Sequence, residues 1–173
     1  MSGFINILLR ATALLWTLLI TALIGNVIAS NVDAAGSASA AINFTMFVAA
    51  LSWVVCLYGI AATLFSPLAR PMVMLPLDCL AVVFTFISAI VLAAKLRAVN
   101  CGNIGGADLP SNWIGFGSHD DEKRCREIQA STAFMWFLWA CFCGALFFTV
   151  KESRSSFGGS IRSSRPNMSQ VGA

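Results

Sequence analysis

The chain has 173 residues, of which 58% are hydrophobic and only 11% are charged, with a formal net charge of +3. A soluble domain carries about a quarter charged residues, so this composition excludes a soluble globular protein and indicates a membrane protein. Four apolar stretches, 4–29, 42–65, 72–94 and 128–150, each exceed the roughly 18 residues that a membrane-spanning helix needs. The sequence predicts an all-α membrane protein, a four-transmembrane-helix bundle over residues 1–150, followed by a tail over 151–173.

The loops between the four spans predict the orientation of the bundle. An even number of spans places both ends of the chain on one side of the membrane, and basic residues near span ends favour the cytoplasmic side. Six basic residues lie on the side of the termini, five lie in the loop 95–127, and none lies in the loop 30–41. We therefore predict cytoplasmic termini and an extracellular loop 95–127, although the five basic residues of that loop oppose this assignment.

Small residues recur at helical spacing in three of the spans. In a membrane, helices associate through close packing rather than through the hydrophobic effect, and small side chains let two helix backbones approach closely. We therefore predict a helix-packing seam at these positions. The alternative is chance recurrence in spans that are rich in alanine. The seam positions are Ala13, Thr17, Thr21 and Gly25 in the first span, Ser52, Cys56 and Gly59 in the second, and Ala140 and Gly144 in the fourth.

Asp78 is a carboxylate inside the third span, where an unpaired charge costs several kcal/mol. At about 1.5 Å per residue it lies about 10 Å from the end of the span, and Arg10 lies at about the same depth in the first span. We predict an intramembrane ion pair between Arg10 and Asp78 that fixes the register of the two helices. In the alternative, Arg10 extends to lipid phosphate, and Asp78 is protonated or bonded to backbone or hydroxyl groups.

Cys101 and Cys125 lie near the two ends of the predicted extracellular loop, whereas the other four cysteines lie within the spans. On an oxidising face of the membrane such a pair forms a disulfide. We therefore predict a disulfide that closes the loop and stabilises the fold by about 3 kcal/mol in the chain-entropy model.

The tail over 151–173 is rich in serine, glycine and arginine, and we expect it to be disordered. Arginine followed by two serines occurs twice in it, so Ser155, Ser156, Ser163 and Ser164 are candidate phosphorylation sites. Phosphorylation there would reverse the attraction of the basic residues to an anionic inner leaflet. Simple anchoring by the basic residues is the alternative.

Several kinds of chemistry lack the residues that they require. His119 is the single histidine and lies in a loop, so no intramembrane haem or metal site is expected. One intramembrane carboxylate with scattered hydroxyl groups does not assemble a nucleophile, a base and an orienting group. We expect no catalytic residue, no metal ligand and no partner nucleic acid, and no cofactor apart from a structural lipid such as a sphingolipid or a sterol.

Four short-looped spans, Asp78 near the start of the third and a cysteine-bearing long loop resemble the MARVEL-domain tetraspan proteins. The chain is most similar to the fungal non-classical export protein 2 family, at essentially full length. The segments that carry this resemblance are 6–10 (NILLR), 67–70 (PLAR), 77–78 (LD), 83–86 (VFTF), 91–93 (VLA), 97–98 (RA), Cys101, 124–126 (RCR) and 129–130 (QA).

The resemblance implies a multi-pass plasma-membrane protein of eisosome-type microdomains. It implies a non-enzymatic organiser of those domains that responds to sphingolipid status and is linked to non-classical protein export. The expected partners are membrane lipids and further copies of the chain or other plasma-membrane proteins, and the resemblance adds eisosome scaffold proteins. The alternative function is a small proton-linked transporter or export factor that uses Asp78.

Overall fold

A computed structural model of the chain describes residues 2–65, 71–106 and 108–162. These residues form the helices α1 (Ser2–Ala29), α2 (Gly36–Leu64), α3 (Pro71–Leu96) and α4 (Asp121–Arg162), and the short 3₁₀ helix η2 (Ile104–Gly106). Each of the four α-helices is long and apolar enough to cross a membrane. The predicted fold class, an all-α bundle of four spans, is confirmed, whereas the side of the membrane on which the termini lie stays a prediction.

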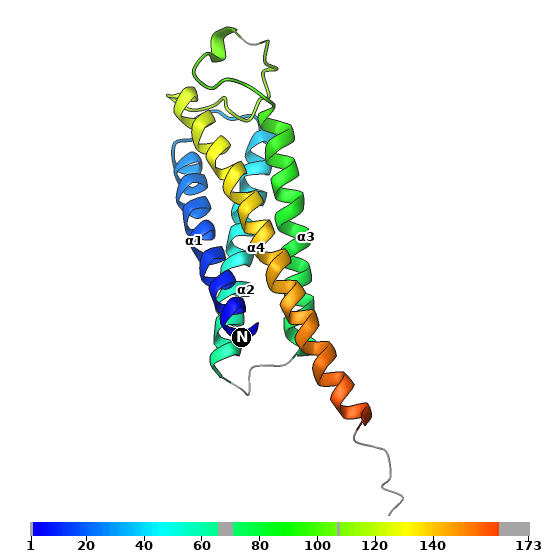
Figure 1. The fold of residues 1–173 in the computed structure, drawn as a ribbon. Helices are drawn as coiled ribbons and strands as arrows, with labels where there is room; N and C mark the ends of the chain where they lie inside the picture. The colour runs from blue at the N-terminus through cyan, green and yellow to red at the C-terminus, as the bar shows by residue number, and fades with distance from the viewer. Residues whose placement is uncertain (1, 66–70, 107, 163–173) are drawn as a thin grey trace, which may run out of the picture.

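The four helices form an antiparallel ring (Figure 1). Helix α1 packs against α2 and α4, and α3 packs against the same two helices, so consecutive helices are neighbours and the contact between α1 and α4 closes the ring. The start of α1 and the end of α4 lie at one end of the bundle, which we call the terminal end. The segment between α3 and α4 lies at the opposite end, which we call the loop end.

Hydropathy predicts the membrane-spanning part of each helix but not its full length. Helix α2 begins at Gly36 rather than at residue 42, and α4 begins at Asp121 rather than at residue 128. Hydropathy marks only the residues suited to hydrocarbon, whereas helical hydrogen bonding continues into polar turns outside it. The first turn of α4 is capped by Asp120, whose carboxylate accepts a hydrogen bond from the backbone N–H of Lys123 at 3.0 Å.

The expectation of a disordered tail from residue 151 is corrected for 151–162, which continue helix α4. Extending an existing helix by one residue avoids the cost of a new helical nucleus, so a polar segment can follow an apolar span without a break. The last turns of α4 extend beyond the other three helices (Figure 1). Residues 163–173 lie outside the described residues.

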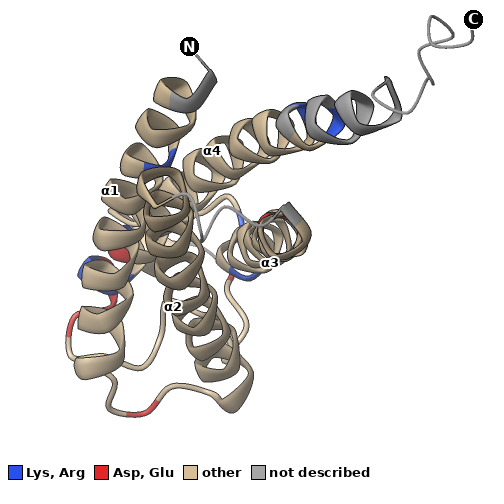
Figure 2. Cartoon of the chain, turned by 90° about the horizontal axis from the view of Figure 1, so that it is seen from below, with Lys and Arg blue, Asp and Glu red and all other residues tan. Residues whose placement is uncertain are grey.

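The core of the bundle is apolar, and so is much of its outer surface. Ile20, Val48, Leu92 and Phe142 are fully buried, one from each helix of the ring. Large apolar side chains elsewhere on the helices face outward, including Leu15, Leu18, Val54, Phe137 and Phe147. Charged residues are scarce along the spans (Figure 2). An apolar exterior of this kind suits a lipid environment, in which packing and polar contacts rather than hydrophobicity hold helices together.

Candidate functional site

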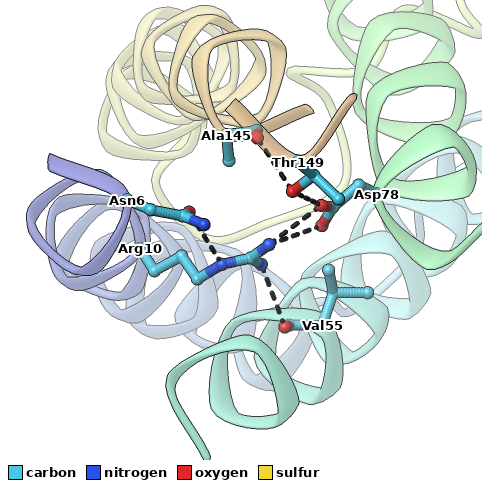
Figure 3. Close-up of polar contacts among 6 residues, drawn as sticks. All are labelled: Asn6, Arg10, Val55, Asp78, Ala145 and Thr149. Atoms are coloured by element: carbon cyan, nitrogen blue, oxygen red, sulfur yellow. Dashed lines mark hydrogen bonds and ion pairs between the residues drawn. The ribbon is translucent and has the colours of Figure 1, made fainter. Parts of the chain in front are cut away.

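The candidate site is a polar cluster near the terminal end of the bundle, centred on Arg10 of α1 (Figure 3). The Arg10 side chain is fully buried, and its Nη2 lies 2.9 Å from Asp78 Oδ2 and 3.0 Å from Asp78 Oδ1. Asp78, on α3, is fully buried as well. The structure thus brings together the two residues for which the sequence predicts an intramembrane ion pair.

The other nitrogens of the Arg10 guanidinium donate hydrogen bonds to two further groups. Nε donates to the side-chain oxygen of Asn6 at 3.2 Å, and Nη1 donates to the backbone carbonyl of Val55 at 3.4 Å. Asn6 lies one helical turn before Arg10, where residues four apart share a face. Val55 lies on α2, and a carbonyl oxygen in a helix retains a second lone pair for such a contact. One guanidinium therefore joins α1, α2 and α3.

Gly59 provides the space that the guanidinium occupies. A Cβ atom at this position would lie 2.3 Å from Cζ and from Nη1 of Arg10, far inside van der Waals contact. Any side chain at residue 59 therefore displaces the guanidinium from its position. The glycine was predicted as a place where helix backbones approach, and in the structure it accommodates the charged side chain of a neighbouring helix.

Helix α4 completes the cluster through Thr149. The Thr149 hydroxyl lies 2.8 Å from Asp78 Oδ2 and 3.0 Å from the backbone carbonyl of Ala145, so its single proton is shared between these two acceptors. Thr149 is buried at 7% exposure. All four helices of the ring thus contribute an atom to the cluster (Figure 3).

The chemistry of this cluster is that of a structural contact. Among the described residues, no fully buried side-chain nitrogen or oxygen lacks a hydrogen-bond partner. A buried ion pair gives little net stability against an apolar replacement, but removal of one partner costs about 3–5 kcal/mol. The cluster therefore disfavours helix arrangements that separate Arg10 from Asp78. In the described part of the chain, no group of three His, Cys, Asp or Glu residues is placed to hold a metal ion.

The predicted small-residue positions lie partly in the helix interfaces. Ala13, Thr17, Ser52, Cys56 and Gly59 are buried, whereas Thr21, Gly25 and Gly144 are half-buried. Ala140 is exposed and lies outside the interface, because it shares the outward face of α4 with Trp136 and Phe137.

Two hydrogen bonds between helices involve hydroxyl groups nearer the middle of the bundle. Trp53 Nε1 of α2 donates to the hydroxyl of Thr21 on α1 at 3.2 Å. Ser88 of α3 donates to the hydroxyl of Thr45 on α2 at 3.2 Å. These contacts join the same neighbours that the Arg10 cluster joins, and sequence reasoning did not identify them.

At the loop end, the segment between α3 and α4 is fastened to the helices. Cys101 and Cys125 are linked by a disulfide, the pairing that the sequence predicts. The Trp113 indole is buried, and its Nε1 donates to the backbone carbonyl of Leu96 at 2.8 Å. Gly117 accepts a backbone hydrogen bond from Val32 at 2.9 Å, which joins this segment to the one between α1 and α2.

Sequence reasoning missed Asn6 and Thr149 in the cluster, and it missed the burial of Arg124 at the loop end. The spacing of four residues between Asn6 and Arg10 is the signal that could have identified Asn6. Of the candidate phosphorylation sites, Ser155 and Ser156 fall in the last turns of α4, and Ser163 and Ser164 lie outside the described residues.

The chain matches known proteins over most of its length. A family model described as the membrane-associating domain MARVEL matches residues 3–148. Non-classical export protein 2 of Saccharomyces cerevisiae is 39% identical over 137 residues, which cover 78% of this chain and 76% of that protein. Non-classical export protein 2 homolog 1 of the same yeast is 36% identical over 121 residues, which cover 69% of this chain and 63% of that protein. No solved structure matches the chain.

Proposed function

Because this chain belongs to the MARVEL family of membrane-associating domains, and within it to the family of non-classical export protein 2, we propose that it is a non-enzymatic organiser of plasma-membrane microdomains. In this proposal the protein resides in eisosome-type domains, responds to sphingolipid status and contributes to non-classical protein export. The names of both yeast relatives, which refer to non-classical export, support the link to export. The family resemblance supports the microdomain and the sphingolipid response.

The observation that carries the proposal is the Arg10–Asp78 cluster, in which atoms of four helices meet around one buried ion pair. A lipid bilayer acts on a helix bundle through its thickness and through helix tilt. In a bundle linked in this way, a change of tilt in any one helix disturbs the ion pair. Lipid composition can therefore bias the balance between helix arrangements, provided that the lipids interact differently with each arrangement.

The proposal is tested by imaging the fluorescently tagged full-length protein in yeast cells before and after acute inhibition of sphingolipid synthesis. Stable cortical patches that change when sphingolipid is depleted are the expected result. The variant Asp78→Leu should lose the response, because Arg10 is left without its counterion. Cys79→Ser is the matched control, since Cys79 is the neighbouring residue and is exposed rather than part of the cluster. Uniform membrane staining that ignores sphingolipid would contradict the proposal.

A second candidate function is a small proton-linked transporter or export factor. The buried carboxylate of Asp78, which accepts a hydrogen bond from Thr149, is the observation that favours it, because intramembrane carboxylates are common in proton relays. The test is proton flux into proteoliposomes that contain a pH-sensitive dye. A flux in the wild-type protein that disappears in Asp78→Asn would favour transport, and equal leakage in both proteins would favour the organiser.

A further inference from the structure

A cleft of about 300 Å³ lies at the loop end of the bundle, opposite to the Arg10–Asp78 cluster. Its walls come from the last turns of α1, the residues that follow α1, the residues before α4 and the first turns of α4. Most of the residues that line it have polar side chains, and Arg124 of α4 is one of them.

Arg124 is a buried cation that makes no direct ion pair with a described residue, although the charges of Asp121 and Glu127 act on it from a distance. It is 2% exposed, and none of the ion pairs among the described residues includes it. Its Nε donates to the Ile114 carbonyl at 3.2 Å, and its Nη1 donates to the Val27 carbonyl at 3.4 Å and to the Asn31 side-chain oxygen at 3.3 Å. Nη2 donates no hydrogen bond to any described residue. Because every fully buried side-chain nitrogen in the described residues has a partner, Nη2 is an atom of Arg124 that keeps some exposure.

The two acidic residues that line the cleft are already engaged elsewhere. Glu127 Oε1 accepts a hydrogen bond from Asn26 at 2.6 Å and lies 4.0 Å from Lys123 Nζ. Asp120 caps the first turn of α4. The carbonyl of Val27, near the carboxyl end of α1, supplies part of a helix dipole, which amounts to about half an elementary charge. The positive charge of Arg124 is therefore balanced by backbone dipoles and by Asp121 and Glu127 at a distance rather than by a direct ion pair.

The walls around Arg124 are held in place by covalent and hydrogen bonds. Cys125, the next residue, is linked to Cys101, and Trp113, the residue before Ile114, is bonded to the end of α3. A binding group that is fixed before its ligand arrives loses less conformational entropy on binding. The free donor of Arg124 is thus presented by a rigid site.

We propose that this cleft binds a phosphate group, with Nη2 of Arg124 as its charged donor. A guanidinium matches phosphate oxygens in geometry and charge, and phosphates are the anions that lipid headgroups place at the end of a membrane-spanning bundle. A phospholipid headgroup and free phosphate share this chemistry. The inference is independent of the proposed function, because it concerns the opposite end of the molecule.

The test measures ligand binding to the purified full-length protein in an uncharged detergent by calorimetry. The probes are dioctanoyl phosphatidylglycerol, dioctanoylglycerol, which has the same acyl chains without phosphate, and inorganic phosphate. The variants are Arg124→Gln, which removes the charge, and Ser30→Trp, which fills the cleft without changing a charged residue. Ser37→Trp is the matched control, since Ser37 is an exposed serine in the first turn of α2 and does not line the cleft.

The expected result is that a phosphate-bearing probe binds the wild type and Ser37→Trp equally, and binds Arg124→Gln and Ser30→Trp about tenfold or more weakly. Binding of phosphatidylglycerol alone assigns the site to a lipid headgroup, and binding of inorganic phosphate as well assigns it to the free anion. Equal binding of dioctanoylglycerol, or unchanged affinity in Ser30→Trp, overturns the proposal. Ser30→Trp decides the outcome if Arg124→Gln does not fold.

Discussion

Replacement of Gly59 by alanine perturbs the Arg10–Asp78 cluster without changing any of its charged groups. The new Cβ atom would lie 2.3 Å from Cζ and Nη1 of Arg10 and 2.4 Å from Nε. The guanidinium is the far end of a flexible side chain, so it can move aside without distorting a helix. It can do so only by abandoning Asp78, Asn6 and Val55, and the carboxylate of Asp78 then stays buried without its counterion.

The magnitude follows from two opposing effects. Breaking a buried ion pair by removal of one partner costs about 3–5 kcal/mol. Alanine is better than glycine in a helix interior by about 1 kcal/mol, which acts in the opposite direction. We expect Gly59→Ala to lower the free energy of unfolding by about 2–4 kcal/mol. Gly25→Ala is the matched control, because a Cβ atom there meets only Met46 Cε at 3.9 Å, and it should be neutral or stabilising.

Unfolding is measured in dodecyl maltoside micelles titrated with sodium dodecyl sulfate, with tryptophan fluorescence as the signal. A second measurement places Gly59→Ala in a background that carries Arg10→Met and Asp78→Leu. Because no guanidinium is present there, the alanine should no longer be destabilising, which gives a coupling of about 2–4 kcal/mol between the sites. If Gly59→Ala is as stable as Gly25→Ala, or is equally destabilising in both backgrounds, Arg10 does not occupy the position described here.

Three further predictions concern the same unfolding measurement. Arg10→Met or Asp78→Leu alone should lower the free energy of unfolding by about 3–5 kcal/mol, and the double replacement should recover most of that loss. Additive losses in the double variant would contradict the pairing. Replacing Cys101 and Cys125 by serine should lower the free energy of unfolding by about 3 kcal/mol, and chemical reduction of the wild type should have the same effect. An unchanged unfolding midpoint after reduction would show that the disulfide does not constrain the loop. Trp113→Phe should cost about 1 kcal/mol through the lost hydrogen bond and should speed proteolysis of the loop, whereas unchanged proteolysis would exclude this anchor.

The sequence predicts the spans and the Arg10–Asp78 pairing for the same physical reason. Depth in a bilayer is proportional to residue count along a helix, so residues on different spans can be compared without knowing how the helices rotate. Arg10 and Asp78 are the rare charges at matching depth, and a buried charge requires a partner. The rotation of each helix about its own axis, which decides which side chains face the cluster, does not follow from the residue count. Thr149 therefore could not be singled out from the other hydroxyl groups of the spans, whereas Asn6 could have been identified from its spacing of four residues from Arg10.

The surroundings of Arg124 depend on long-range folding of the loop. In the sequence Arg124 is one of five basic residues between the third and fourth spans, and nothing distinguishes it from its neighbours. Its burial requires Ile114 to return to the bundle and the end of α1 to lie beside the start of α4. Contacts between residues separated by 97 positions in the chain are set by the packing of the whole ring.

The ring order of the helices determines how the cluster responds to deformation. Arg10 and Asp78 belong to α1 and α3, which lie across the bundle axis from each other (Figure 2). The carbonyl of Val55 on α2 and the hydroxyl of Thr149 on α4 bond to the pair from the two remaining sides.

In an apolar interior the attraction between charges is strong and unpaired charges are costly, so partial separation of Arg10 from Asp78 is disfavoured. Packed elements with such contacts switch between discrete arrangements rather than deform continuously. In the proposed function, a lipid signal should therefore act by changing the populations of two arrangements, and Gly59→Ala, which disfavours the paired arrangement, should shift the sphingolipid level at which the response occurs.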